Sequence, residues 1–170
     1  MNKEIQIIDN IFSSEYFESL QKMFLSNSFP WFIESDSVYE NDGHPQLIHL
    51  IYRNFEPVSE SWNYIKDLIG TLQSYGLYGL YRIKANGTPI YSEIVEKEFH
   101  VDMREPDKSV TPHRVAIFYI NSNDGYTIFE DGTKVDSVAN RMVLFPGHLK
   151  HAGTTCTNAP LRVVLNIVYI

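Results

Sequence analysis

The stretch 114–145 reads RVAIFYINSNDGYTIFEDGTKVDSVANRMVLF and alternates short apolar runs with tight-turn signals. The runs are rich in Tyr, Ile, Val and Phe, which favour strands, and the Asn-Asp-Gly and Asp-Gly sequences between them are typical of hairpin turns. Similar runs lie on both sides, so we expect strands at 77–84, 114–121, 126–130, 142–146 and 162–169. Many short strands joined by tight turns, without helical periodicity between them, predict an antiparallel β-sandwich or jelly roll.

The first part of the chain has helical patterns instead. Ser-Ser-Glu at 13–15 is typical of a helix start, because serine can cap the first turn and glutamate lies near the positive end of the helix dipole. A second helix is expected over 59–74, where apolar residues share one face at a period of 3.6. We expect a short strand at 5–9 and an exposed loop over the polar stretch 34–46.

The chain has no repeat, low-complexity tract or linker that would divide it. We therefore expect one domain, 1–170, in which a helical segment at 1–76 supports a β core at 77–170. Two longer polar loops, 86–98 and 103–113, are expected to act as covers over this core.

Composition and charge exclude several classes of protein. With 170 residues, 44% of them apolar and 21% charged, the chain has the composition of a globular domain and not of a disordered one. Its 21 acidic and 14 basic residues give a net charge of −7, which argues against nonspecific binding to nucleic-acid phosphates. No apolar run is long enough to span a membrane, and the N-terminus lacks a signal-peptide pattern. We therefore expect a cytoplasmic protein.

Any metal site in this chain must use nitrogen and oxygen ligands. The single cysteine, Cys156, excludes an internal disulfide bond and a site of several thiolates, whereas there are six histidines and 21 carboxylates. In Phe-His-Val-Asp, at 99–102, His100 and Asp102 would point to the same side of an extended strand. Such a pair can supply two ligands of a facial triad of two histidines and one carboxylate on non-haem Fe(II). The alternative is a salt-bridged surface pair.

A third ligand would come from a histidine on a distant strand. The segment FPGHLKHAG, at 145–153, offers His148 and His151. His151 begins an extended run and is followed by small residues, so we favour it, whereas His148 follows Pro-Gly and is expected to lie in a turn. The remaining histidines have no partner pattern: His44, His49 and His113.

Arg162 opens the last apolar strand and is the other notable charge. A buried arginine is costly without an anionic partner, and its planar fork suits a carboxylate held by two hydrogen bonds. The alternative is a surface arginine paired with a nearby acid. Together with the triad, Arg162 is better explained as the binding group for a small dicarboxylate.

The order His100-x-Asp102, His151 and Arg162 resembles the iron(II)/2-oxoglutarate-dependent oxygenases, particularly their prolyl 4-hydroxylase-like branch. Three further segments resemble that branch in the same order: AIFYIN at 116–121, GYTIF at 125–129 and NRMVLF at 140–145. The resemblance covers about 77–170. The part that ends near Phe29-Pro30-Trp31 is similar to the N-terminal helices of small phage-encoded and bacterial members.

The resemblance implies a double-stranded β-helix (a cupin-like jelly roll) behind N-terminal helices, and a metal-dependent hydroxylase. Fe(II) would be held by His100, Asp102 and His151. The cosubstrate 2-oxoglutarate would chelate this iron, and Arg162 would bind its distal carboxylate. With O2, the enzyme would decarboxylate 2-oxoglutarate to succinate and CO2 and hydroxylate a C–H bond of a second substrate.

Two tyrosines are further candidates for the cosubstrate site. Tyr119 matches a tyrosine of the branch whose hydroxyl reaches the distal carboxylate, and ordinary core packing is the alternative reading. Tyr81, on the first expected core strand, is the other candidate. Where the branch often has a tyrosine shortly before the glycine of this strand, the present chain has Ile83.

These residues do not specify the substrate that is hydroxylated. On the branch resemblance we prefer a peptide or protein side chain, such as a prolyl residue. The small size of the chain suits a bacterial or phage-infected cell as the source. Candidate substrate-side residues lie in the loops around the His-x-Asp motif: Tyr91, Met103 and Arg104. Two other classes are a cupin-like metal-dependent oxygenase that does not use 2-oxoglutarate, and a noncatalytic jelly-roll binding module. The oligomeric state is not encoded in any of these patterns.

Overall fold

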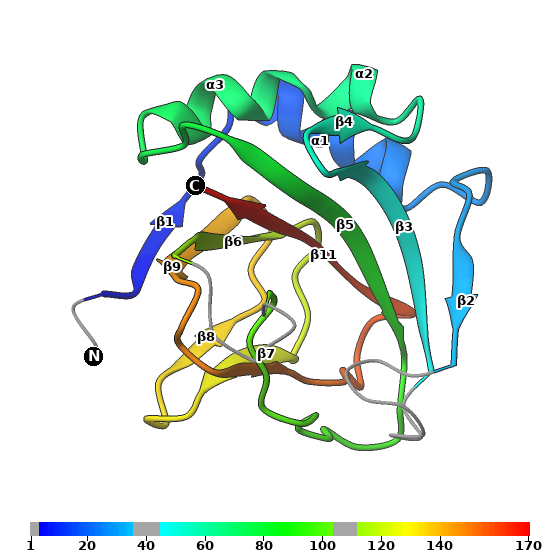
Figure 1. Cartoon of the computed structure of the whole chain (residues 1–170). Helices are drawn as coiled ribbons and strands as arrows, with labels where there is room; N and C mark the ends of the chain where they lie inside the picture. The colour runs from blue at the N-terminus through cyan, green and yellow to red at the C-terminus, as the bar shows by residue number, and fades with distance from the viewer. Residues whose placement is uncertain (1–3, 36–44, 104–111) are drawn as a thin grey trace.

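The computed structural model describes residues 4–35, 45–103 and 112–170, which are built mainly from antiparallel strands (Figure 1). Eight of the described strands form a larger sheet. Its strand order is β1 (Gln6–Asp9), β9 (Arg141–Pro146), β6 (Arg114–Tyr119), β11 (Leu161–Tyr169), β5 (Leu80–Pro89), β3 (Gln46–Arg53) and β2 (Phe32–Glu34), with β4 (Glu56–Pro57) paired to β3.

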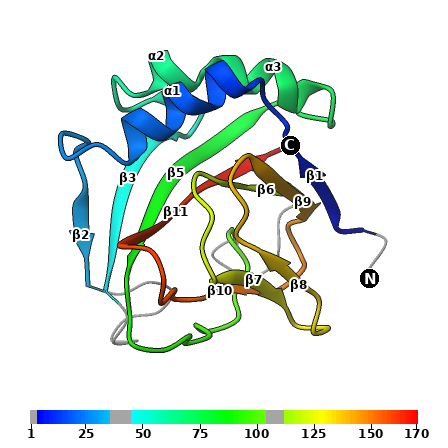
Figure 2. The same ribbon diagram turned by 180° about the vertical axis from the view of Figure 1, so that it is seen from behind.

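A smaller sheet faces one side of the larger sheet, as both views show (Figure 1 and Figure 2). Its strands are β10 (His151–Gly153), β7 (Tyr126–Phe129) and β8 (Lys134–Asp136), in that order. Two facing antiparallel sheets, with strands that alternate between them along the chain, form the predicted jelly-roll core. The predicted fold class, mainly β with N-terminal helices, is confirmed.

The helices of the described chain cover the other side of the larger sheet (Figure 2). They are α1 (Ser14–Phe24), α2 (Trp62–Ile65) and α3 (Asp67–Gln73). Ser13 caps α1, as predicted, because its side chain accepts a hydrogen bond from the backbone N–H of Tyr16. The helix expected over 59–74 is divided at Lys66, whose φ of −56° and ψ of −29° remain helical, so the interruption is slight.

The apolar core has two parts. The larger part lies between the helices and the larger sheet and includes Leu20, Phe24, Leu68, Leu72, Ile83 and Leu165. A smaller part lies between the two sheets and includes Tyr119, Phe129, Val135 and Phe145. The helices therefore stabilise the sheet from behind and leave its opposite side available for a site.

The expected boundary between a helical segment and a β core at residue 77 is wrong, because β2, β3 and β4 precede it. Strand β3 pairs along most of its length with β5, so it belongs to the larger sheet. The sequence of β3, QLIHLIYR, is apolar on both sides and lacks the alternation that identifies a half-buried strand. Its residues pair with residues 29 to 40 positions further along the chain, from Arg53 with Arg82 to Leu47 with Gly87.

The expected loops fit the structure in part. Residues 36–44 of the loop expected at 34–46 and residues 104–111 of the loop expected at 103–113 lie outside the described residues. The loop expected at 86–98 begins later than predicted, because β5 continues to Pro89. No helix in the described residues is long and apolar enough to cross a membrane.

Candidate metal centre

The backbone brings His100 and His151 together although they are distant in the sequence. Each donates its backbone N–H to the carbonyl oxygen of the other, at 3.0 Å in both directions. This pairing is an isolated antiparallel bridge between His100 and the first residue of β10. Residues paired in this way point their side chains to one side, and the two imidazole rings lie with their centroids 4.7 Å apart.

Asp102 completes a cluster of three residues. Its Oδ2 lies 3.4 Å from Nε2 of His151, and one ligand atom from each of His100, Asp102 and His151 lies within 4.8 Å of the other two. In the part of the chain that the structure describes, no other group of three or more His, Cys, Asp or Glu residues is close enough together to hold a metal ion. The structure thus brings together the three predicted ligands, whereas His148 is exposed and lies outside the cluster.

Backbone carbonyls fix the orientation of both imidazoles. Nδ1 of His100 lies 3.1 Å from the carbonyl oxygen of Glu98, and Nδ1 of His151 lies 3.3 Å from that of Leu149. A carbonyl oxygen can only accept, so each Nδ1 must carry the proton and donate it. In the neutral ring each Nε2 then carries a lone pair, which is the form that binds a metal.

His151 is neutral at ordinary pH. Its burial lowers its pKa to about 4, although the nearby carboxylate of Asp102 acts in the opposite direction. The lone pair of Nε2 therefore faces the unpaired Oδ2 of Asp102 at 3.4 Å, with both side chains almost completely buried. Two buried electron-pair donors so close together repel each other unless a cation lies between them. The residues present fit a divalent metal.

The Asp102 carboxylate is held by two neighbours on the larger sheet. Its Oδ1 accepts hydrogen bonds from Arg82 at 2.8 Å and from the side-chain amide of Asn166 at 2.9 Å. Burial opposes ionisation of Asp102, but the charges around it and the hydrogen bond from Asn166 hold its pKa well below the usual range. Its Oδ2 has no hydrogen-bond partner and remains free to bind a metal.

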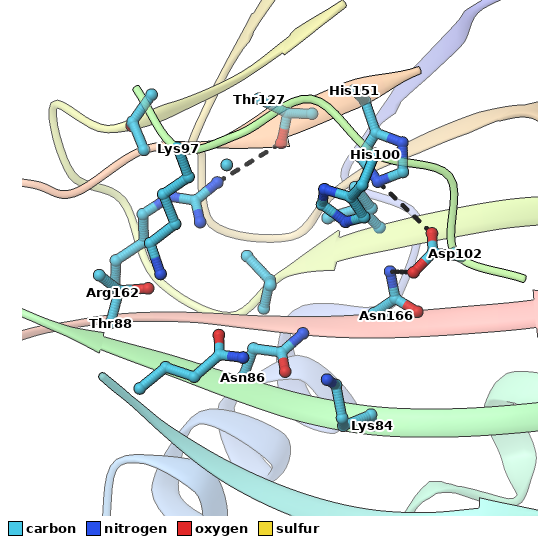
Figure 3. Close-up of a pocket in the computed structure, with 15 residues that line it drawn as sticks. Lys84, Asn86, Thr88, Lys97, His100, Asp102, Thr127, His151, Arg162 and Asn166 are labelled. Carbon is cyan, nitrogen blue, oxygen red and sulfur yellow. Dashed lines mark hydrogen bonds and ion pairs between the residues drawn. The ribbon is translucent and has the colours of Figure 1, made fainter. Parts of the chain in front are cut away.

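The cluster lies at one end of a cavity of about 90 Å³, which we name the first cavity (Figure 3). Polar side chains from β5 and β11 form much of its wall: Lys84, Asn86, Thr88, Arg162 and Asn166. Lys97 and Thr127 also line it. Figure 3 places Arg162 and Lys97 at the end away from the three cluster residues, so the cavity has basic side chains at one end and the metal-ligating group at the other.

Arg162 is buried, with 4% of its surface exposed, and points into this cavity. It donates to the Ser137 hydroxyl at 2.9 Å and to the Tyr126 carbonyl at 3.2 Å. No carboxylate of the described residues lies within 4 Å of it. Gly125 leaves it space, because a Cβ there would lie 2.8 Å from Cδ of Arg162. The alternative of a surface arginine paired with an acid is wrong.

The two predicted tyrosines do not line the first cavity. Tyr119 is fully buried behind it, where its hydroxyl donates to the Thr127 hydroxyl at 2.8 Å and its ring lies 5.8 Å from the guanidinium of Arg162. Of these two bonded hydroxyls, that of Thr127 belongs to a residue lining the first cavity, and that of Tyr119 does not. Tyr81 lines a different cavity, together with Met103, and its ring packs edge-on against Phe55 at 5.8 Å.

Those of the remaining histidines and candidate substrate-side residues that the structure describes do not join the metal cluster. His49 is buried, with its ring nitrogens 2.7 Å from the Pro30 carbonyl and 2.6 Å from the Ser59 hydroxyl, so it is a structural histidine. His113 is also buried, and its ring packs directly against Gly147. Tyr91 contributes to neither of the cavities described above. His44 and Arg104 lie outside the described residues.

Several site residues were not predicted from the sequence, chiefly Arg82, Lys84, Thr127 and Asn166. Asn166 offered a signal, because it is a polar residue within the otherwise apolar run VVLNIV. Arg82 and Lys84 offered a similar one, as charged residues within the strand sequence YRIKA. A polar side chain inside a buried strand is costly unless it has a partner or a function.

Comparisons with known proteins agree with this geometry at the level of the fold. No model of a protein family matches the sequence, and no curated protein matches it. Among solved structures, a prolyl hydroxylase from Trichoplax adhaerens in complex with a peptide fragment of hypoxia inducible factor is similar, with a TM-score of 0.70 at 17% identity over 99% of this chain and 84% of that one.

Two further solved structures resemble this chain about as closely. An oxidoreductase of the 2OG-Fe(II) oxygenase family from Burkholderia pseudomallei has a TM-score of 0.73 at 11% identity, over 99% of this chain and 85% of that one. A viral collagen prolyl hydroxylase from Paramecium Bursaria Chlorella virus-1, in complex with 2OG, has a TM-score of 0.62 at 15% identity, over 99% of this chain and 98% of that one. The chain has the fold of the 2-oxoglutarate/Fe(II) oxygenases.

Proposed function

We propose that this protein is an Fe(II)- and 2-oxoglutarate-dependent dioxygenase that hydroxylates a C–H bond. The observation that supports this most is the content of the first cavity. One end holds two histidines and one carboxylate, and the other end holds a buried arginine without an acidic partner among the described residues. These are the groups needed to bind a metal and a dicarboxylate side by side.

In this proposal His100, Asp102 and His151 hold Fe(II) through Nε2, Oδ2 and Nε2. Bound Fe(II) supplies the redox chemistry that allows O2, 2-oxoglutarate and a C–H bond to react with one another. Arg82 and Asn166 keep Asp102 ionised and direct its free oxygen into the cluster. The carbonyls of Glu98 and Leu149 keep both imidazoles in the tautomer that binds a metal.

Arg162 binds the distal carboxylate of 2-oxoglutarate, assisted by the hydroxyl of Thr127. Its guanidinium is fixed by Ser137 and the Tyr126 carbonyl, so little side-chain freedom is lost when the carboxylate binds. Tyr119 positions Thr127 and contributes to this end indirectly. The overall reaction is balanced: 2-oxoglutarate, O2 and the substrate give succinate, CO2 and the hydroxylated substrate.

A peptide or protein side chain is the preferred substrate class, since the similar Trichoplax structure contains a peptide. We also treat the chain as one domain and place the reaction in the cytoplasm of a bacterial or phage-infected cell. The buried, unpaired Cys156 suits a reducing compartment of that kind.

An anaerobic titration tests the proposal. Apoprotein that receives Fe(II) and then 2-oxoglutarate should develop the visible charge-transfer band of the chelate, and admission of O2 should release succinate. The variant His151→Ala should lose the band, whereas His148→Ala, a histidine three residues away and outside the cluster, should keep it. Absence of the band and of succinate with the folded wild-type protein would refute the proposal.

The same titration separates the two other classes. A cupin-like oxygenase that does not use 2-oxoglutarate would bind Fe(II) without developing the band. A noncatalytic binding module would release no succinate when O2 is admitted. The buried Arg162, which has no acidic partner among the described residues, favours the first proposal over both, since neither alternative requires a cation at that end of the cavity.

A further inference from the structure

A second cavity, of about 360 Å³, lies beside the first on the larger sheet. Both cavities are lined by Lys84 and by Asp102, one of the proposed metal ligands. The second cavity therefore borders the same residue as the first. If 2-oxoglutarate occupies the first cavity, a separate molecule in the second one would lie next to Asp102.

Among the described residues, the charges that line the second cavity do not balance one another. Three basic residues, Arg53, Arg82 and Lys84, face two acidic ones, Glu34 and Asp102. Asp102 is already paired with Arg82 at 2.8 Å. Glu34 is 3.9 Å from Lys84, a long distance for an ion pair, and its side chain is 44% exposed. A local excess of positive charge is notable in a chain whose net charge is −7.

The strand register places like charges opposite each other. Arg53 of β3 is the direct cross-strand partner of Arg82 of β5, and both line the second cavity. Like charges in this position destabilise an antiparallel pair. No carboxylate of the described residues lies within 4 Å of Arg53. An anion bound next to Arg53 would relieve this repulsion.

Lys84, like Arg53, lies in surroundings that disfavour its positive charge. Burial lowers its pKa, and the charge of Arg82 acts in the same direction, whereas the charges of Glu34 and Asp102 oppose this shift only in part. Lys84 lies directly opposite Leu50 in the register of β3 and β5. Half-buried Leu50 and Ile48 point to the same side of β3 and give the cavity an apolar wall next to its basic one.

We propose that the second cavity binds the molecule to be oxidised and selects one with a carboxylate, which pairs with Arg53 and Lys84 while an apolar portion packs on Ile48 and Leu50. This inference rests on the proposed function. The carboxylate belongs either to a free organic acid or to an acidic side chain of a peptide. In both cases the apolar portion extends along the sheet and the oxidised C–H bond lies near Asp102.

Calorimetry on protein loaded with Mn(II) and saturated with 2-oxoglutarate tests the proposal without turnover. The probes are 3-phenylpropanoate and its uncharged amide, and a capped Leu-Glu-Leu tripeptide and its Leu-Gln-Leu counterpart. In at least one pair the acid should bind about tenfold more tightly than the amide, as expected for a charge-assisted pair. The pair that shows this preference identifies the source of the carboxylate.

Variants assign the preference to Arg53. Arg53→Gln should reduce the acid-to-amide ratio to about twofold or less, and Arg53→Lys should keep part of it because the charge remains. Lys150→Gln, which removes an exposed cation paired with Glu130, is the matched control and should keep the full ratio. Equal affinity for acid and amide in both pairs, or an unchanged ratio in Arg53→Gln, would overturn this inference and leave the proposed function unaffected. Failure to bind 2-oxoglutarate would instead overturn the proposed function, and the inference with it.

Discussion

The two faces of the central strands β5 and β11 are both largely buried, yet their side chains differ completely. Toward the helices the strands present apolar residues: Leu80, Ile83 and Ala85 from β5, and Val163, Leu165 and Ile167 from β11. Toward the first cavity they present Lys84, Asn86, Thr88, Arg162 and Asn166, with Val164 as the apolar exception. Both faces belong to the same two strands, so the difference reflects what each face contacts.

Burial of the apolar face stabilises the fold, because each fully buried aliphatic side chain contributes about 1.5–3 kcal/mol. Burial of charged and amide groups on the other face opposes folding unless each group has a partner. Some of these groups have one, as Asn166 does in Asp102, whereas Arg162 has no acidic partner among the described residues. The cavity face is therefore adapted to binding, and the helix face to stability.

The largest expected effect is on the metal. Asp102→Ala should reduce the affinity for Mn(II), used as a redox-inert probe of the iron site, by more than about 100-fold, because it removes the charged ligand and leaves Arg82 close to the cation. Calorimetry measures this affinity. Asp136→Ala, at an exposed position on β8, is the control, and a similar affinity in both variants would show that the cluster is not the metal site.

The next effect tests the helix face. Ile167→Ala should lower the free energy of unfolding by about 2–5 kcal/mol, since Ile167 is fully buried against the helices. Urea denaturation monitored by circular dichroism gives this value. Ile33→Ala, at a side chain that is 82% exposed, should change it by less than about 0.5 kcal/mol. A strong loss of Mn(II) affinity in folded Ile167→Ala protein would contradict the division between the two faces.

A smaller effect is expected at the far end of the cavity. Arg162→Ala should raise the Kd of 2-oxoglutarate about 10- to 100-fold, as expected for the loss of a charge-assisted hydrogen-bonded pair, while Mn(II) still binds. Titration of the Mn(II) protein with 2-oxoglutarate measures it. Arg141→Ala removes an arginine that pairs with Asp9 at the surface, and should leave this Kd within about twofold. Equal Kd values in the two variants would exclude the proposed role of Arg162.

The smallest effect concerns Asn166, a buried amide whose burial opposes folding but whose hydrogen bond orients Asp102 for metal binding. Asn166→Leu replaces the amide that orients Asp102 by a side chain of similar size. We expect the affinity for Mn(II) to fall about tenfold and the free energy of unfolding to change by less than about 1.5 kcal/mol. Parallel calorimetry and urea denaturation separate these quantities. A large loss of stability with unchanged affinity would make Asn166 a structural residue instead.

The metal cluster could be predicted because its signals are local. His100 and Asp102 are two residues apart, and the small residues after His151 distinguished it from His148. The resemblance then placed Arg162, which the structure brings into the same cavity. The strands with tight turns were also predicted, since hairpin signals are confined to short windows.

Features that depend on distant contacts could not be predicted in this way. The sequence of β3 does not alternate, and its partner β5 lies far along the chain. Arg82 becomes part of the site only because its strand lies beside Asp102. Tyr119 matched a motif, but Thr127 lies between Tyr119 and the cavity. Which of these two side chains lines the cavity depends on how the two sheets pack against each other.

A crystal structure of the protein with Mn(II) and 2-oxoglutarate would show whether one cavity holds both the metal and the dicarboxylate. Anomalous scattering should place Mn(II) between Nε2 of His100, Nε2 of His151 and Oδ2 of Asp102, with the distal carboxylate of 2-oxoglutarate on the guanidinium of Arg162. Mn(II) bound elsewhere in crystals where these three side chains are ordered, or 2-oxoglutarate bound away from Arg162, would contradict the account.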